Sequence, residues 1–165
     1  MQMTRVFFDM DGVIAQYKEV PPEELYREGY FAQLEPCFEC IGALALLAAD
    51  PQIEVHTLSA VLPDSKYALA EKQAWFDRYL RQYKITPIFM YCGESKREKV
   101  PGGILPSDIL IDDYNENLRD WSKEAVAIKF LNGINDRHGS WQGARAGGSA
   151  AEIAAAVYGQ IRKVS

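Results

Sequence analysis

Four aspartates stand directly after short hydrophobic runs of the sequence. Asp9 and Asp11 follow the run Val-Phe-Phe, and Asp112 and Asp113 follow the run Ile-Leu-Ile. If these runs end at one place in the fold, the carboxylates repel one another by about 1 kcal/mol per pair in water, and by more in a drier cleft. A hard divalent cation that prefers oxygen ligands and also binds phosphate offsets this repulsion, so the pattern predicts a Mg²⁺ site. The alternative, that each Asp only caps the helix after it, explains one such residue better than four.

A hydroxyl group follows a third hydrophobic run. Ser59 comes directly after the segment 53–58, and Thr57 stands two residues before it. Residues two apart in a strand share one face, so either hydroxyl would lie on the same side of the sheet. We expect Ser59 beside the aspartates, with Thr57 in its place if the register of the strand differs.

Positioning these side chains requires strands that alternate with helices. Unbroken apolar runs are typical of strands that are buried on both faces of a parallel sheet. The predicted strands are 6–8, 53–58, 85–90, 109–111 and 125–130, and the predicted helices are about 41–48, 63–83, 115–121 and a last one starting at a Ser149–Glu152 capping box. This alternation predicts an α/β fold with a doubly wound parallel sheet. In such sheets the working site lies at the carboxyl ends of the strands, where the acids are.

Two segments fall outside this alternation. Residues 16–36 are charged, aromatic and proline-containing, with a short helix predicted at 23–27, which indicates an insertion after the first strand. Residues 132–148, which include Arg137 and His138, form a long connection after the last predicted strand. This connection is long for a loop, and it starts at a strand end, where the site is expected. It is therefore able to reach the site.

Size and composition exclude several classes of protein. The 165 residues fit one domain, 1–165, and the 48% hydrophobic and 25% charged residues exclude a disordered chain. Eighteen Lys and Arg against 23 Asp and Glu give a net charge of −5, which favours a small phosphorylated partner over a nucleic acid polymer. Neither a signal-peptide pattern nor a membrane-length apolar stretch is present, so we expect a cytoplasmic protein. Cys37 and Cys40 have the spacing of a zinc or redox pair, but no second pair accompanies them.

Three of these stretches together resemble a known superfamily. The segment 6–13, Val-Phe-Phe-Asp-Met-Asp-Gly-Val, resembles the first motif of the haloacid-dehalogenase-like (HAD) superfamily, a hydrophobic strand followed by Asp-X-Asp-X-(Thr or Val). Ser59 at its strand end is similar to the second motif, and 109–113 resembles the fourth. The resemblance implies a HAD-like Rossmannoid fold.

Two further stretches are similar to one branch of that superfamily. The spacing of 29–36 and of 71–75 resembles the 5′(3′)-deoxyribonucleotidases. The whole resemblance spans about 5–117, and it implies that the insertion at 16–36 is a small helical cap. This insertion is shorter than the cap of a typical deoxyribonucleotidase, which bears on the identity of the substrate.

The resemblance also implies how the aspartates work. Asp9 would be the nucleophile that forms an aspartyl-phosphate, and Asp11 would be the general acid that later activates water. The Asp9 side chain, the backbone carbonyl of Asp11 and Asp112 would hold Mg²⁺. Asp113 would act through water or orient Asp112.

Phosphate binding requires a hydroxyl and a lysine in this superfamily. Ser59, or Thr57 in the other register, would hold phosphate oxygens together with backbone N–H groups. Lys72 fits the Glu-Lys-X-X-Trp run of the nucleotidases, and Lys96 competes with it because it precedes the fourth motif. For either lysine, the alternative is a solvated helix face.

Aromatic residues of the insertion are the candidates for substrate contact. Tyr30 and Phe31 are expected to stack on a base or to exclude water from the phosphate. The alternative is that they pack the insertion onto the core.

The sequence thus predicts a Mg²⁺-dependent phosphoric monoester hydrolase, resembling a 5′-nucleotidase, whose substrate is a mononucleotide. The alternative substrate is a sugar phosphate or another small phosphorylated metabolite. A receiver-type signalling module would carry its acidic pair after the first strand and a phosphorylated Asp after the third, which is the opposite order. A relative without activity is disfavoured because the acids, a hydroxyl and lysines are all present.

Overall fold

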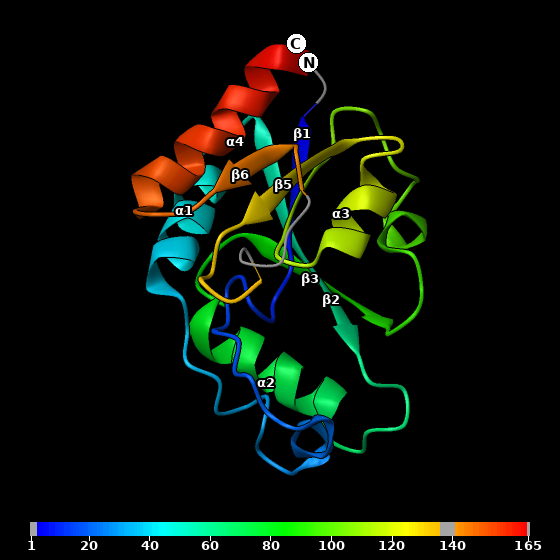
Figure 1. Cartoon of the computed structure of the whole chain (residues 1–165). Helices are drawn as coiled ribbons and strands as arrows, with labels where there is room; N and C mark the ends of the chain where they lie inside the picture. The colour runs from blue at the N-terminus through cyan, green and yellow to red at the C-terminus, as the bar shows by residue number, and fades with distance from the viewer. Residues whose placement is uncertain (1–2, 136–140, 165) are drawn as a thin grey trace.

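The computed structural model describes residues 3–135 and 141–164, so Arg137 and His138 lie outside the described residues. A six-stranded sheet runs through the molecule in the order β3-β2-β1-β4-β5-β6 (Figure 1). Each neighbouring pair of strands is parallel. The strands are β1 (Thr4–Phe8), β2 (Ile53–Val61), β3 (Ile85–Tyr91), β4 (Ile109–Asp112), β5 (Val126–Phe130) and β6 (Ala144–Ala146). The predicted α/β fold with a doubly wound parallel sheet is confirmed.

Helices cover both faces of this sheet (Figure 1). They are α1 (Phe38–Ala48), α2 (Ala68–Tyr79), α3 (Asn115–Trp121) and α4 (Ala150–Val164), with short 3₁₀ helices η1 (Pro22–Tyr26) and η2 (Lys96–Lys99). The predicted capping box begins α4, since Ser149 N donates to Glu152 Oε2 at 2.8 Å and Glu152 N donates to Ser149 Oγ at 3.3 Å.

Strand β1 shows why its apolar run is unbroken. Val6 and Phe8 pack in one hydrophobic cluster with α1 and α4, whereas Phe7 packs in a second cluster with α3. All three side chains are fully buried. A strand with helices on both faces buries every residue, and this places the polar residue that follows at the edge of the sheet.

The predicted helix 63–83 was too long at both ends, and one strand was not predicted. Helix α2 begins at Ala68 rather than near residue 63. Ser65 Oγ accepts hydrogen bonds from Tyr67 N at 3.3 Å and Ala68 N at 3.1 Å, so a turn precedes the helix. Strand β6 was missed because three residues in a glycine-containing stretch give no periodic signal.

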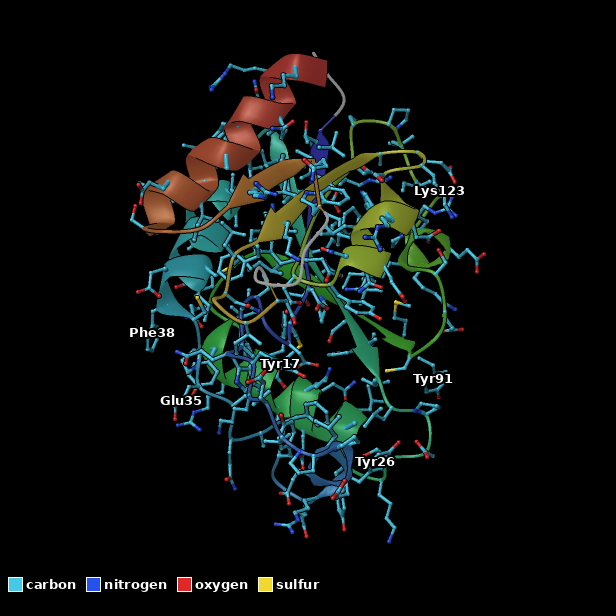
Figure 2. The ribbon with its side chains drawn as sticks, in the orientation of Figure 1. Tyr17, Tyr26, Glu35, Phe38, Tyr91 and Lys123 are labelled. Atoms are coloured by element: carbon cyan, nitrogen blue, oxygen red, sulfur yellow. The ribbon has the colours of Figure 1, made fainter. Side chains whose placement is uncertain are left out.

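The segment 16–36 leaves and re-enters the fold at one place. Gln16 N donates to Glu35 O at 2.8 Å, and Ala15 forms an antiparallel bridge with Pro36. Between these ends the segment lies along α2, where Tyr17 and Tyr26 are each 41% exposed (Figure 2). Within the described residues no helix is both long and apolar enough to span a membrane.

Candidate active site

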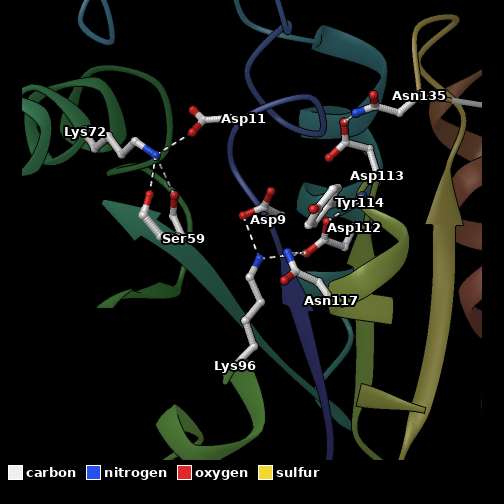
Figure 3. A network of polar contacts seen from close by, with 11 residues as sticks. Asp9, Asp11, Ser59, Lys72, Lys96, Asp112, Asp113, Tyr114, Asn117 and Asn135 are labelled. Atoms are coloured by element: carbon white, nitrogen blue, oxygen red, sulfur yellow. Dashed lines mark hydrogen bonds and ion pairs between the residues drawn. The ribbon is translucent and has the colours of Figure 1, made fainter. Parts of the chain in front are cut away.

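Three carboxylates meet at the carboxyl edge of the sheet. Strand β1 pairs with β4 so that Phe8 lies opposite Ile111, and Asp9 N donates to Ile111 O at 2.9 Å. This register brings Asp9 beside Asp112, and one oxygen from each of Asp9, Asp112 and Asp113 lies within 4.8 Å of the others. All three residues are at most 9% exposed. We call these residues the acidic cluster (Figure 3). The strand ends predicted that these three carboxylates would meet, but they predicted Asp11 in the same group, and Asp11 is not part of it.

Lys96 enters the acidic cluster from η2. Its Nζ donates to Asp9 Oδ1 and to Asp112 Oδ2, each at 2.7 Å. The lysine is 4% exposed. Burial lowers the pKa of the Lys96 ammonium, but the carboxylates of Asp112 and Asp9 outweigh burial and hold this pKa above its ordinary value. The lysine is therefore charged and partly neutralises the cluster.

Neighbouring residues hold Lys96 in place. Ser95 Oγ donates to Asp120 Oδ2 at 2.6 Å, and Arg97 donates to both oxygens of Asp120 at 3.0 and 3.1 Å. Asp120 belongs to α3, so both neighbours of Lys96 in the chain are bound to the same helix. A two-point contact between Arg and carboxylate fixes orientation as well as distance.

Asp112 is oriented by the start of α3. Its Oδ1 accepts from Tyr114 N at 2.8 Å, and its Oδ2 accepts from Asn117 Nδ2 at 2.9 Å. Burial and the Asp9 charge raise the pKa of Asp112, while Lys96 opposes them. Asn117 thus contacts the acidic cluster directly.

Asp113 is held by two amides at the start of the connection 132–148, the segment predicted to reach the site. Its Oδ2 accepts from Asn132 Nδ2 at 2.8 Å and also from Asn135 Nδ2. Asn132 donates further to Gly12 O at 3.0 Å, which joins the loop after β5 to the loop after β1. Gly12 has φ +80°, and a Cβ there would lie 2.3 Å from Asp113 Oδ2, so glycine is required at this close approach. Because Asn132 follows β5 closely, the strand-end rule itself is the signal that points to it.

Asp11 points away from the acidic cluster and toward a second lysine. Lys72 Nζ donates to Asp11 Oδ2 at 2.5 Å, to Ser59 Oγ at 3.1 Å and to Ala60 O at 2.6 Å. We call Asp11, Ser59 and Lys72 the Lys72 group (Figure 3). Burial raises the pKa of the Asp11 carboxyl, Lys72 opposes burial, and the charge of Asp9 adds to it. Asp11 Oδ1 is buried without a hydrogen-bond partner in the described part of the chain.

The two hydroxyls of β2 have different surroundings. Ser59 contacts Lys72, whereas Thr57 Oγ1 is buried and has no hydrogen-bond partner among the described residues. Thr57 pairs with Phe8, the last residue of β1, whereas Ser59 lies beyond the paired part of β1. Ser59 is therefore the hydroxyl of this pair that lies at the edge with Asp11 and Lys72.

A small cavity adjoins the Lys72 group. It has a volume of about 130 Å³ and is lined by Asp11, Lys72, Ala60, Leu62 and Cys92, together with Gln16, Tyr17, Leu25, Tyr30, Phe31 and Leu34 from the insertion. The two candidate substrate residues, Tyr30 and Phe31, thus lie beside Asp11. A larger hollow of about 700 Å³ lies on the other side of the loop after β1, and none of the four aspartates lines it.

The charges of the acidic cluster fit a divalent cation. Three carboxylates face one ammonium group, and burial together with Asp9 and Asp112 raises the pKa of Asp113 to about 7. Burial is the largest cause of this rise in pKa, and the negative charges of Asp9 and Asp112 add to it. Buried carboxylate oxygens are the donors that Mg²⁺ prefers, so Asp9, Asp112 and Asp113 are chemically suited to hold this ion.

Comparison with known protein families finds one whose profile matches most of the chain. The sequence profile of a family described as "5′ nucleotidase, deoxy (Pyrimidine), cytosolic type C protein" matches residues 19–146. None of the curated protein sequences matches the chain.

Solved structures similar to this chain are also found. Two of them are described as "Structure of Pnkp1/Rnl/Hen1 complex" and "Structure of the Pnkp1/Rnl/Hen1 RNA repair complex". Each is 15% identical with a TM-score of 0.54 over 77% of this chain. The chain spans 46% and 43% of the length of those chains, and at this identity the likeness concerns the fold alone.

Proposed function

The chain belongs to the family of deoxy (pyrimidine) cytosolic type C 5′-nucleotidases, and on this premise we propose that it is a Mg²⁺-dependent phosphomonoesterase that works through an aspartyl-phosphate on Asp9. The family is one of nucleotidases, which are phosphoric monoester hydrolases. The observation that carries the finer proposal is the acidic cluster, whose three carboxylates meet at one strand edge beside Lys72 and Ser59.

Asp9 is the proposed nucleophile. A carboxylate oxygen of Asp9 attacks phosphorus, the bond to the leaving oxygen breaks, and the phosphoryl group is carried on Asp9 until water removes it. Lys96 holds Asp9 Oδ1 at 2.7 Å, which limits the rotation of the carboxylate before attack. Preorganisation of this kind lowers the reorganisation that the reaction requires.

Asp11 is the proposed acid and base. It gives a proton to the leaving oxygen in the first step and takes a proton from the attacking water in the second. The first role requires a carboxyl group that holds a proton, and burial raises the pKa of Asp11 in that direction. Its unpartnered Oδ1 is the atom available for this exchange among the described residues.

Ser59 and Lys72 are the proposed phosphate-binding residues, with Lys96 serving the nucleophile instead. Lys72 lies between Asp11 and Ser59, whereas Lys96 already has two carboxylate partners. Asp9, Asp112 and Asp113, with the backbone carbonyl of Asp11, would hold Mg²⁺. When bound, this ion supplies positive charge to the phosphoryl oxygens and to the acidic cluster.

The cavity beside Asp11 is the proposed site of the leaving group. Its insertion side carries Tyr17, Tyr30 and Phe31, which offer flat apolar surface. A sugar phosphate would lose hydrogen bonds on entering such a cavity, so a mononucleotide is favoured over the alternative metabolite. We infer that residues 16–36 act as a small cap on a single catalytic domain, 1–165, and that the enzyme is cytoplasmic.

The test is phosphate release from p-nitrophenyl phosphate with Mg²⁺ and with a chelator, followed by 5′- and 3′-mononucleotides and sugar phosphates. We expect release with Mg²⁺, loss of release with the chelator, and higher kcat/KM for a pyrimidine deoxynucleotide than for any sugar phosphate. Equal release with and without the chelator contradicts the Mg²⁺-dependent mechanism. A preference for sugar phosphates contradicts the nucleotide assignment alone.

A further inference from the structure

One carboxylate on α2 binds the backbone of the insertion. Glu71 Oε1 accepts from Gly29 N at 2.5 Å, and Glu71 Oε2 accepts from Phe31 N at 3.0 Å and Ala32 N at 3.4 Å. Gly29 has φ +86°, a conformation that glycine adopts without strain. The turn at 29–32 thus aims three N–H groups at one anionic group, which is an arrangement that favours negative charge.

The same helix face makes two more contacts with this turn. Trp75 Nε1 donates to Leu34 O at 2.8 Å, and Lys72 Nζ lies 4.7 Å from the centroid of the Phe31 ring. Glu71, Lys72 and Trp75 all contact this turn of the insertion. Trp75 is four residues after Glu71 and three after Lys72, the spacings that bring helical residues to the same side. The Glu-Lys-X-X-Trp run therefore supplies a lysine to the site and also binds the insertion.

The residues fixed by Glu71 are walls of the cavity beside Asp11. Tyr30 lies between Gly29 and Phe31, both of which Glu71 holds, and Tyr30, Phe31 and Leu34 all line the cavity. Without this carboxylate the three N–H groups lose a charged acceptor, and hydrogen bonds to charged groups are stronger than those between neutral groups. The cavity wall would then separate from α2.

We propose that Glu71 is a positioning residue that holds residues 29–34 against α2 and thereby forms the subsite for the leaving group. This proposal rests on the proposed function for its kinetic part. Lys72 has its own three contacts, with Asp11, Ser59 and Ala60, so the phosphate-binding end of the site does not depend on Glu71. Glu71 therefore serves recognition of the organic group and not the chemical step.

The test compares Glu71→Gln with Asp77→Asn. Glutamine keeps the size of the side chain but loses the charge and replaces one acceptor oxygen by an N–H donor. Asp77 is an exposed residue of the same helix, so its change removes the same charge without touching the insertion. Trp75→Phe is a second variant, since it removes the donor to Leu34 and leaves Glu71 in place.

The kinetic measurement uses two substrates, a pyrimidine deoxynucleoside monophosphate and acetyl phosphate, whose leaving group is too small to fill the cavity. In Glu71→Gln we expect KM for the nucleotide to rise about tenfold with kcat unchanged. This is the result when a contact is lost that stabilises the bound substrate and the transition state equally. Neither KM nor kcat for acetyl phosphate changes, and Asp77→Asn behaves like the wild type. Trp75→Phe shifts KM in the same direction. Unchanged KM for the nucleotide in Glu71→Gln, or an equal loss on both substrates, overturns the proposal.

A second measurement does not depend on turnover. Amide hydrogen exchange at Gly29, Phe31 and Ala32 should become at least tenfold faster in Glu71→Gln and stay unchanged in Asp77→Asn. Unchanged exchange overturns the holding role even if KM rises. If the wild type releases phosphate from neither substrate, the proposed function is wrong, and the exchange result still decides whether Glu71 holds the turn.

Discussion

Two buried lysines approach the same edge of the sheet, and their surroundings differ in charge. In the Lys72 group, Lys72 faces one carboxylate, that of Asp11, together with a hydroxyl and a backbone carbonyl. In the acidic cluster, Lys96 faces Asp9 and Asp112, with Asp113 close by. Figure 3 shows the two groups side by side.

This difference in charge indicates what each group binds. In the Lys72 group one carboxylate balances one ammonium group, and the side chain of Asp11 is 32% exposed. The charge of this group therefore does not require a metal ion. The acidic cluster has two more carboxylates than ammonium groups, and the side chains of Asp9 and Asp112 are 13% and 0% exposed. Uncompensated buried charge is costly, which supports the proposal that a cation binds beside Asp9 and that the leaving group lies beside Asp11.

The largest effect should follow Asp9→Asn. The amide removes the nucleophile, so Mg²⁺-dependent phosphate release should fall by about 10⁴-fold or more. The fold should persist, because β1 is held by its neighbours on both sides, and the thermal midpoint serves as the control. Substantial turnover by a folded Asp9→Asn protein would show that Asp9 is not the nucleophile.

Asp11→Asn should affect the Lys72 group and leave the acidic cluster unchanged. Loss of the acid and base lowers kcat by about 10²–10⁴-fold. Binding of Mg²⁺, followed by calorimetry on the same protein, should stay within about threefold of the wild type because the Asp11 side chain is outside the acidic cluster. A large loss of Mg²⁺ affinity would show that the side chain of Asp11 takes part in metal binding.

Lys96→Met tests the charge excess of the acidic cluster. Removing one partner of a buried ion pair costs about 3–5 kcal/mol, so the metal-free protein should lose about 3 kcal/mol in its free energy of unfolding. Mg²⁺ should recover much of this loss, since a ligand at about 100 times its Kd stabilises by about 2.7 kcal/mol. Denaturant unfolding with Mg²⁺ and with a chelator measures both values; an equal loss under the two conditions contradicts the charge argument.

Lys72→Met should act on phosphate instead. Inorganic phosphate should inhibit this variant about tenfold less strongly, because one cationic hydrogen bond to the anion is lost. Stabilisation by Mg²⁺ should be the same as in the wild type. If Lys96→Met weakens inhibition by phosphate and Lys72→Met does not, the assignments of the two lysines are reversed.

The smallest effect is expected at a buried polar group that belongs to neither region. His56 is 4% exposed and stacks on Phe7 with ring centroids 4.9 Å apart, and its nitrogens lack hydrogen bonds in the described structure although Glu54 lies 3.1 Å away. Burial lowers its pKa from 6.5, so the unfolded state takes up the proton first. Its neutral form therefore favours folding above pH 6.5, and this stability is lost as the pH falls.

His56→Phe should remove that dependence. Its free energy of unfolding should fall less than that of the wild type between pH 7 and pH 5, as measured by urea unfolding. Parallel curves for the two proteins would show that His56 contributes no such dependence.

Much of the fold was predictable because the signals were local. The apolar runs that became β1, β2, β4 and β5 each indicate a buried parallel strand from the local sequence alone. The run that became β3 also indicates a strand, although β3 lies at the edge of the sheet and is largely exposed or half-buried. The start of α2 was missed because a serine side chain, rather than propensity, sets that boundary. Strand β6 was missed because its three residues depend on pairing with β5.

The acidic cluster was partly predictable for a related reason. Polar residues at the ends of parallel strands must meet, so Asp9, Asp112 and Asp113 could be grouped from the sequence. Asn132 and Asn135 were not grouped with them, although both follow a strand end. Their contact with Asp113 depends on the path of a loop, which has no periodic pattern.

Local sequence patterns were enough to predict the strand that precedes each aspartate. They also predicted that carboxylate oxygens gather at the carboxyl edge of the sheet, with an excess of negative charge. Only the tertiary structure decided that Lys72 serves Asp11 and Lys96 serves Asp9, and that Glu71 holds the insertion. Those pairings join residues far apart in the chain. Their partners are set by which elements pack together, through contacts such as that of Arg97 with Asp120, and no local pattern encodes such contacts.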